Sequence, residues 1–137
     1  MSDIVIVGAD SGIGYYMAQS LLERGNRVAV LDIRTEHISA LTESFPDRLL
    51  VFKADARDLQ SVFEGVREAY DRFGSVDVAI HNACLCTFES EPDTDIETYR
   101  KVMDVNFYGA LRLAKAVLPF MREGKRGRVS FLSSGGC

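Results

Sequence analysis

The feature that most constrains this chain is a glycine-rich segment close to its N-terminus. The segment runs from Val7 to Gly14, follows an apolar run over residues 4–7 and leads into an amphipathic stretch that begins at Ile13. This order predicts a buried strand, a tight turn and a helix. Glycines let a backbone approach an anion closely, and the first turn of a helix offers unpaired N–H groups at the positive end of its dipole. The pattern predicts a pyrophosphate site, with an ordinary strand–turn–helix junction as the alternative.

Asp32 is the second part of that pattern, because it stands at the end of the next apolar run, over residues 27–31. A carboxylate at this place can accept hydrogen bonds from the ribose hydroxyls of an adenosine, and it repels a 2′-phosphate. The sequence therefore favours NAD over NADP, although Arg34 could contact a phosphate and keeps NADP as the weaker alternative. A solvated strand end is the structural alternative for Asp32.

Strand-like and helix-like stretches alternate along the whole chain. Apolar runs predict strands over residues 3–7, 27–31, 49–53, 76–81 and 128–132. Helical periodicity predicts helices over residues 13–24, 35–44, 59–72 and 95–122. We expect helices to stop at Gly25, Gly74 and Gly124, and Asp58 to cap the helix that begins near Leu59. The alternation predicts one α/β domain over residues 1–137, with a parallel sheet covered by helices on both faces.

Composition narrows the class of protein. The chain has 137 residues, of which 47% are hydrophobic and 26% charged, and its formal net charge is −4. We therefore expect neither nucleic acid nor an anionic membrane surface as a partner, and no apolar run is long enough to span a bilayer. The N-terminus does not resemble a signal peptide, and three cysteines without disulfide-scaffold spacing fit a reducing compartment. We expect a cytoplasmic protein.

Several side chains of types that often bind metals or act in catalysis are interpreted as structural in this sequence. Cys84 and Cys86 have too few other ligands nearby to predict zinc, so we expect no metal site, and we expect both thiols to be buried and unreactive. His81 ends an apolar run and is interpreted as structural. One of Tyr15 and Tyr16 should pack in the core.

Five motifs occur in an order that is typical of one enzyme family. They are the glycine turn, Asp55 after the third strand, Asn82-Ala83 after the fourth, Asn106 in the long helix, and Ser133-Ser134 at the end of the fifth strand. On these motifs the chain resembles the N-terminal part of the short-chain dehydrogenase/reductase family. The resemblance implies a three-layer, doubly wound parallel sheet of Rossmann type, truncated after the fifth strand.

The resemblance also implies roles for particular residues. Ser134 would donate a hydrogen bond to a substrate carbonyl, and Asn106 would support a proton relay from a kinked helix. The implied reaction is hydride transfer between NAD(H) and a small-molecule alcohol or ketone. The residues expected to bind the cofactor, NAD rather than NADP, are Gly8, Asp10, Ser11, Gly12, Ile13, Gly14, Asp32, Ile33, Asp55, Ala56, Asn82 and Ala83.

Three of these polar residues also have structural alternatives. Asp55, implied by the resemblance to contact the adenine ring, could instead cap the helix that follows it. Asn82 could tie neighbouring strand backbones together or serve as a plain turn residue. Asn106 could mark a helix kink and nothing more, because Asn is a poor residue for a helix interior.

The chain departs from the family pattern at three positions. Val7 replaces a threonine whose hydroxyl would brace the turn. Asp10 puts a carboxylate inside the phosphate loop, where it would weaken pyrophosphate binding unless it points away. Cys84 replaces a glycine and would be strained if that position requires a positive φ.

The largest departure is the acid/base pair of the family. No tyrosine in this sequence is followed four residues later by a lysine, whereas the family uses a Tyr-x-x-x-Lys pair to protonate the carbonyl oxygen. Two interpretations stay open. The chain is the N-terminal part of an oxidoreductase and is inactive or poorly active by itself, or it is a non-catalytic dinucleotide-binding module. The sequence does not name a substrate.

The helical stretch over residues 95–122 also predicts association. In the family that the chain resembles, these helices pack against a partner subunit. We expect a homo-oligomer held by these helices, or by pairing of an open strand edge. A stripe at helical spacing, most of which should be core, consists of Leu111, Ala114, Val117, Leu118 and Met121.

Overall fold

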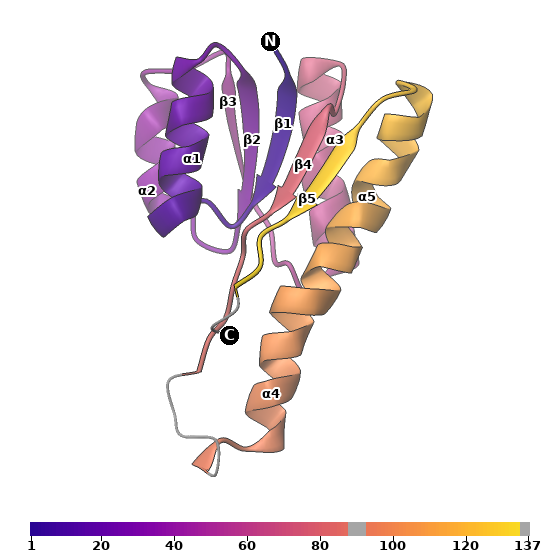
Figure 1. The fold of residues 1–137 in the computed structure, drawn as a ribbon. Helices are drawn as coiled ribbons and strands as arrows, with labels where there is room; N and C mark the ends of the chain where they lie inside the picture. The colour runs from indigo at the N-terminus through magenta and orange to yellow at the C-terminus, as the bar shows by residue number, and fades with distance from the viewer. Residues whose placement is uncertain (88–92, 135–137) are drawn as a thin grey trace.

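A computed structural model describes residues 1–87 and 93–134. Its centre is a parallel five-stranded sheet in the order β3-β2-β1-β4-β5 (Figure 1). The middle strand, β1, is buried along its whole length, as expected for a parallel sheet with both faces covered. The strands are β1 (Asp3–Val7), β2 (Arg27–Asp32), β3 (Leu49–Lys53), β4 (Val78–His81) and β5 (Arg128–Phe131).

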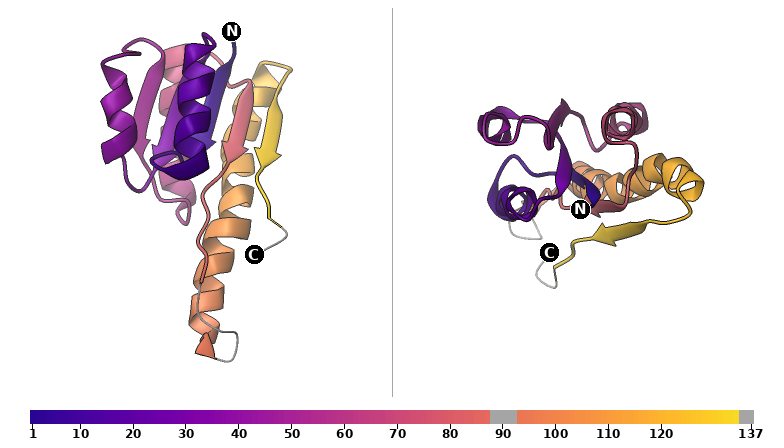
Figure 2. Two further views of the ribbon diagram at one scale, coloured as in Figure 1. Left: turned by 60° about the vertical axis from the view of Figure 1, so that its left-hand side comes forward. Right: turned by 90° about the horizontal axis from the view of Figure 1, so that it is seen from above.

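Helices cover both faces of the sheet. The α-helices are α1 (Gly12–Glu23), α2 (Glu36–Ser39), α3 (Leu59–Phe73), α4 (Ile96–Met103) and α5 (Gly109–Glu123). A 3-10 turn, η1 (Ala40–Thr42), follows α2, and a π-helical turn, η3 (Asp104–Tyr108), joins α4 to α5. α1 and α2 pack on one face of the sheet, and α3 and α5 on the other, as the view from above in Figure 2 shows. Within the described residues, no helix has the length and apolar character needed to cross a membrane.

This arrangement confirms the predicted fold class, a three-layer, doubly wound parallel sheet of Rossmann type. The strands agree with the predictions to within two residues at either end. The largest difference is that β4 begins at Val78 instead of residue 76. The preceding segment is engaged elsewhere, because the side chains of Ser75 and Asp77 bond to Asp3.

Two predicted helices differ from the observed ones. The stretch over residues 35–44 holds the short α2 and the turn η1, because Ile38, Leu41 and Phe45 all have to reach one core cluster before the chain enters β3. The stretch over residues 95–122 forms one helical column, but its middle turn is π-helical. That column extends past the carboxyl ends of the strands (Figure 1).

The helix ends agree with most of the predicted signals. α3 stops at Gly74, which takes a left-handed φ of 85°, and it begins at Asp58, whose side chain accepts the N–H of Gln60. α5 stops at Gly124 as predicted, but Gly124 has a φ of −71°. The left-handed conformation falls on the next residue, Lys125, at 54°. A helix can therefore end at a glycine without using its conformational freedom.

Candidate functional site

The glycine turn between β1 and α1 packs tightly against the end of β4. Gly8 has a φ of 87°, and a Cβ at this position would lie 2.5 Å from the backbone of Ala83. A Cβ at Gly14 would collide with the carbonyl of Gly8. Gly12, at a φ of 57°, has nothing within 4 Å of its Cβ position. The turn is therefore closed by packing at Gly8 and Gly14, whereas no protein atom packs against the Cβ position of Gly12.

Asn82 ties this turn to the sheet. Its Nδ2 donates a hydrogen bond to the Gly8 carbonyl at 2.6 Å. Its backbone N–H and that of Ala83 both donate to the Val7 carbonyl, at 2.8 and 2.9 Å. The carboxyl ends of β1 and β4 are held together by these bonds, so Asn82 does more than fill a turn.

Asp32 stands at the end of β2 beside the same turn. Its carboxylate accepts the backbone N–H of Asp10 at 2.9 Å and that of Arg34 at 3.1 Å. Among the ion pairs of the described residues, none involves Asp32. A carboxylate has about four acceptor positions, so this one retains capacity to bind hydroxyl groups in the cavity that it lines.

The Asp10 carboxylate, expected to weaken pyrophosphate binding unless it points away, bonds to the start of α2. Asp10 is only 5% exposed, and its Oδ1 accepts the backbone N–H groups of His37 and Ile38, each at 2.9 Å. The carboxylate therefore serves the N-terminus of α2, where the helix dipole favours a negative charge. Because it points away from the glycine turn, its charge does not face a bound pyrophosphate.

Asp55 follows β3 and is paired with Arg57. Both Arg57 Nε and Nη2 donate to the carboxylate, with the shortest distance, 2.7 Å, from Nη2 to Oδ2. These side-chain hydrogen bonds hold the pKa of Asp55 below its usual range. The alternative that Asp55 caps α3 is wrong, because Asp58 occupies that position.

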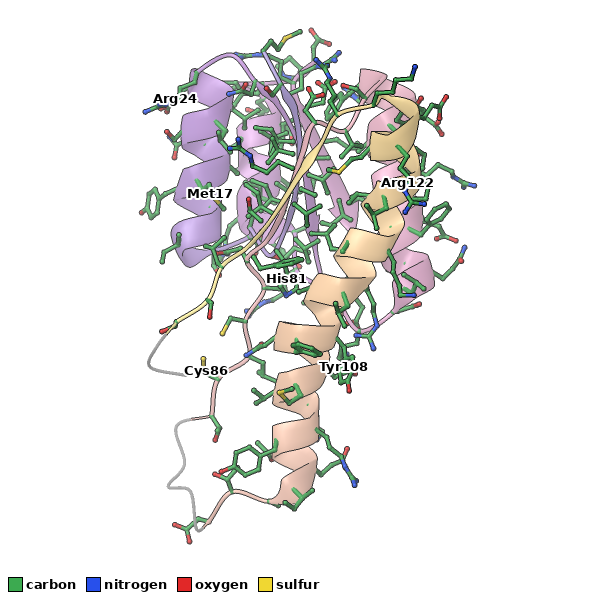
Figure 3. The ribbon with its side chains drawn as sticks, turned by 45° about the vertical axis from the view of Figure 1, so that its right-hand side comes forward. Met17, Arg24, His81, Cys86, Tyr108 and Arg122 are labelled. Carbon is green, nitrogen blue, oxygen red and sulfur yellow. The ribbon has the colours of Figure 1, made fainter. Side chains whose placement is uncertain are left out.

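Asn106 lies in the π-helical turn η3 and bonds to the segment after β4. Its Oδ1 accepts the N–H of Leu85 at 2.7 Å, and its Nδ2 donates to the Leu85 carbonyl at 2.9 Å. These two bonds satisfy the side-chain amide of Asn106 and offset the cost of an asparagine inside a helix. Figure 3 shows this segment, marked by Cys86, running beside the helix that carries Tyr108.

His81 lies between the sheet and the same turn, at the end of β4 (Figure 3). It is 2% exposed, and its Nε2 lies 3.1 Å from the carbonyl oxygen of Val105. Its Nδ1 is buried without a hydrogen-bond partner among the described residues. Burial lowers the pKa of His81, so the ring is neutral and donates from Nε2 to Val105. This agrees with its structural interpretation.

These elements line an open cavity of about 440 Å³ at the carboxyl end of the sheet. The predicted cofactor residues that line it are Gly8, Ser11, Asp32, Ile33, Asp55, Ala56, Asn82 and Ala83. Those that do not line it are Asp10, Gly12, Ile13 and Gly14. Sequence analysis missed Leu31, Ala54, Arg57, Leu85 and Val105 in the wall. Only Arg57 had a signal in the sequence, as a cation two residues after Asp55.

Ser134 lies in the exposed segment after β5 and does not line this cavity. The N–H of Leu132 donates to the His81 carbonyl at 3.0 Å, so the segment leaves the sheet next to the end of β4. Of the two expected catalytic residues, Ser134 thus follows β5, and Asn106 bonds to the segment that follows the neighbouring strand β4.

The cysteines differ from expectation. Cys84 and Cys86 are both exposed, so the prediction of buried thiols is wrong. Cys84 does not have a positive φ and carries no backbone strain of that kind. Within the described part of the chain, no group of three or more His, Cys, Asp or Glu residues could hold a metal ion. Of the two tyrosines, Tyr15 packs against the core and Tyr16 is 71% exposed, as predicted.

Comparisons with known proteins agree with this geometry. A family model described as short chain dehydrogenase matches residues 2–137. The 2-(R)-hydroxypropyl-CoM dehydrogenase of Xanthobacter autotrophicus is 36% identical over 130 residues, covering 88% of this chain and 52% of that protein. A short-chain dehydrogenase from Streptomyces avermitilis has a TM-score of 0.89 at 29% identity, covering 98% of this chain and 50% of that one.

A 3-ketoacyl-(acyl-carrier-protein) reductase from Brucella melitensis, solved in complex with NADH, shares the fold. Its TM-score is 0.89 at 22% identity, covering 98% of this chain and 58% of that one. The chain spans about half the length of the curated relatives it matches, with shares of 47%, 44% and 52% in three of them. With a family model that matches nearly every residue, the chain belongs to the short-chain dehydrogenase/reductase family, whose members are oxidoreductases that use NAD(P)(H).

Proposed function

We propose that this chain binds NAD(H) in the cavity at the carboxyl end of its sheet. The observation that carries the proposal is the convergence of the glycine turn, Asp32 and Asn82 on one cavity. No side chain caps the N-terminus of α1, so the first N–H groups of that helix can bind a pyrophosphate beside the open face of Gly12.

The adenosine half of the cofactor fits between the ends of β2 and β3. Asp32 accepts hydrogen bonds from the ribose hydroxyls and repels a 2′-phosphate, which favours NADH over NADPH. Asp55 and Arg57 flank the adenine, and the Asp55 carboxylate is already negative because of its ion pair. Arg34 is the residue that would favour NADPH, since it is the cation next to Asp32 in the cavity wall.

The nicotinamide half fits toward the segment after β4, where Ala83, Cys84 and Leu85 line the cavity. The bound cofactor supplies a hydride for exchange with an alcohol or ketone. Asn106 holds Leu85 in place, and Ser134 donates a hydrogen bond to the substrate carbonyl. Because the residues of this sequence include no Tyr-x-x-x-Lys pair, we propose that they bind the cofactor with little or no turnover.

A second function, a dinucleotide-binding module without dehydrogenase chemistry, is favoured by the same missing pair. A turnover assay with NADH and a panel of ketones separates this chain from an active enzyme. NADH oxidation that rises in proportion to protein concentration would overturn both the module and the proposal of little turnover.

Calorimetric titration with NADH and NADPH tests the binding proposal. We expect saturable NADH binding and weaker NADPH binding. Asp32→Asn should weaken NADH binding about tenfold, since one charged hydrogen-bond acceptor is lost, and should narrow the preference between the two cofactors. Asp71→Asn, which removes the same charge from an exposed site on α3, should change neither affinity. No binding of either cofactor by the folded wild-type chain would refute the proposal.

We also propose that the chain forms a homodimer through α4 and α5. Val117 and Met121 of the predicted stripe are buried in the core, whereas Leu111 and Leu118 are 42% and 40% exposed. Ile96 and Phe107 add further exposed apolar surface along the same column. Light scattering at micromolar concentration should give a dimer for the wild type and a monomer for Leu111→Glu. A monomeric wild type would contradict this.

A further inference from the structure

Two cysteines lie next to each other where the segment after β4 leaves the sheet. The Sγ atoms of Cys84 and Cys86 are 3.2 Å apart, and both residues are exposed. A disulfide bond is about 2.05 Å long, so the two sulfur atoms need to approach by only about 1 Å. Cys84 lines the cavity at the end of the sheet, and Cys86 does not. One thiol of the pair therefore lies at the wall of the cavity, and the other lies outside it.

The residue between them carries the contacts of Asn106. Leu85 exchanges two backbone hydrogen bonds with the Asn106 side chain, and Asn106 Nδ2 also lies 3.7 Å from Cys84 Sγ. A bond between the two sulfur atoms closes a small ring that contains the Leu85 backbone. Rotation of that backbone weakens at least one of the bonds to Asn106, so a change at the thiols reaches the π-helical turn.

We propose that Cys84 and Cys86 form a reversible disulfide with a small-molecule disulfide such as glutathione disulfide as the oxidant, and that this modification weakens binding at the adjoining part of the cavity. One cysteine thiolate attacks glutathione disulfide and releases one glutathione. The second thiolate attacks the mixed disulfide at the protein sulfur and releases the other. The protein loses two electrons and two thiol protons, and glutathione disulfide gains the electrons as two molecules of glutathione. Two sulfur atoms already in contact favour ring closure over a second glutathionylation.

Mass spectrometry of the intact chain tests the modification by itself. The background is Cys137→Ser, which leaves only the two cysteines in question. After incubation with glutathione disulfide, this protein should lose the mass of two hydrogen atoms and regain it with dithiothreitol. The matched control, Cys86→Ser in the same background, should instead accumulate one glutathione. Ring closure should be faster in the folded chain than in urea. A folded chain that carries glutathione on both cysteines, or closes no faster than in urea, would overturn the proposal.

The effect on the cavity rests on the proposed function and is measured separately. We expect the oxidised chain to bind NADH about fivefold more weakly than the reduced chain, the loss that follows from one weakened hydrogen bond. ADP-ribose, which lacks the nicotinamide, should bind equally to both forms, and dithiothreitol should return the oxidised chain to the NADH affinity of the reduced chain. If the reduced chain binds neither ligand, the proposed function has failed. If the reduced chain binds both NADH and ADP-ribose, and oxidation leaves the NADH affinity unchanged, the proposed effect of the disulfide on the cavity is wrong.

Discussion

Charged side chains gather at both ends of the sheet, but they are arranged differently. At the amino end, Asp3 receives two hydrogen bonds from the Arg27 guanidinium, at 2.6 and 2.8 Å, and another from the Ser75 hydroxyl. Arg27 also donates to the Phe73 carbonyl at 2.6 Å, and Asp77 accepts the Asp3 N–H at 3.0 Å. Each of these four side chains has a partner within the protein.

At the carboxyl end, Asp32 and the N-terminus of α1 keep capacity for further hydrogen bonds. Asp32 accepts only backbone N–H groups, and the first turn of α1 has no side-chain cap. Asp55 is intermediate, since its ion pair with Arg57 lies at the cavity wall. The comparison teaches that a closed polar network serves stability, whereas an acceptor with spare capacity at a cavity favours a ligand.

The largest expected effect is on stability, and it tests whether packing at the carboxyl end of the sheet also contributes to the free energy of unfolding. Gly8→Ala should lower the free energy of unfolding by about 3 kcal/mol or more, because its Cβ would meet the Ala83 backbone and the residue has a left-handed φ. Gly25→Ala is the matched control, with the same φ of 87° and open space around it, and should cost only about 1 kcal/mol. Equal losses in urea denaturation would show that packing at Gly8 is unimportant.

The next effect separates the two ends. Asp3→Ala should cost about 2–3 kcal/mol, because it leaves the partly buried Arg27 without its carboxylate. The NADH affinity of the folded fraction should stay unchanged. Asp32→Asn should give the opposite result, with little loss of stability and weaker NADH binding. The comparison breaks down if Asp3→Ala weakens binding as strongly as Asp32→Asn does.

A smaller effect concerns Asp10, which lies at the carboxyl end of the sheet but, like the acids at the amino end, is bonded within the protein. Asp10→Ala should cost about 1–2 kcal/mol, because two N–H groups at the start of α2 lose their acceptor. Asp10→Asn keeps one acceptor oxygen and should recover part of that loss. Chemical denaturation measures both. A variant as stable as the wild type would mean that solvent replaces the carboxylate at no cost.

The smallest effect is a pH dependence at His81. Burial lowers its pKa in the folded state, so between about pH 7 and pH 5 the unfolded chain binds a proton that the folded chain does not. Stability should therefore fall as the pH falls through this window. His81→Gln, which keeps a donor for the Val105 carbonyl, should show a flatter profile in urea denaturation from pH 7 to pH 5. An unchanged slope would assign the pH dependence to other groups.

Much of this molecule could be predicted because its signals are local. The apolar runs, the glycine turn and the cap at Asp58 depend on residues only a few positions apart, and the structure confirms each of them. The end of β2 brings Asp32 to the cavity because the sheet is parallel, as the alternation along the chain predicts.

The sequence by itself thus determined the parallel sheet and half of the cavity wall. Only the tertiary structure decided what particular side chains do there. The Asp10 carboxylate turns to a helix 27 and 28 residues away, and the Asn106 amide reaches Leu85 across 21 residues. Cys84 and Cys86 are exposed because the chain leaves the sheet beside the long helix. Such partners are chosen by packing between distant segments, and no local spacing encodes them.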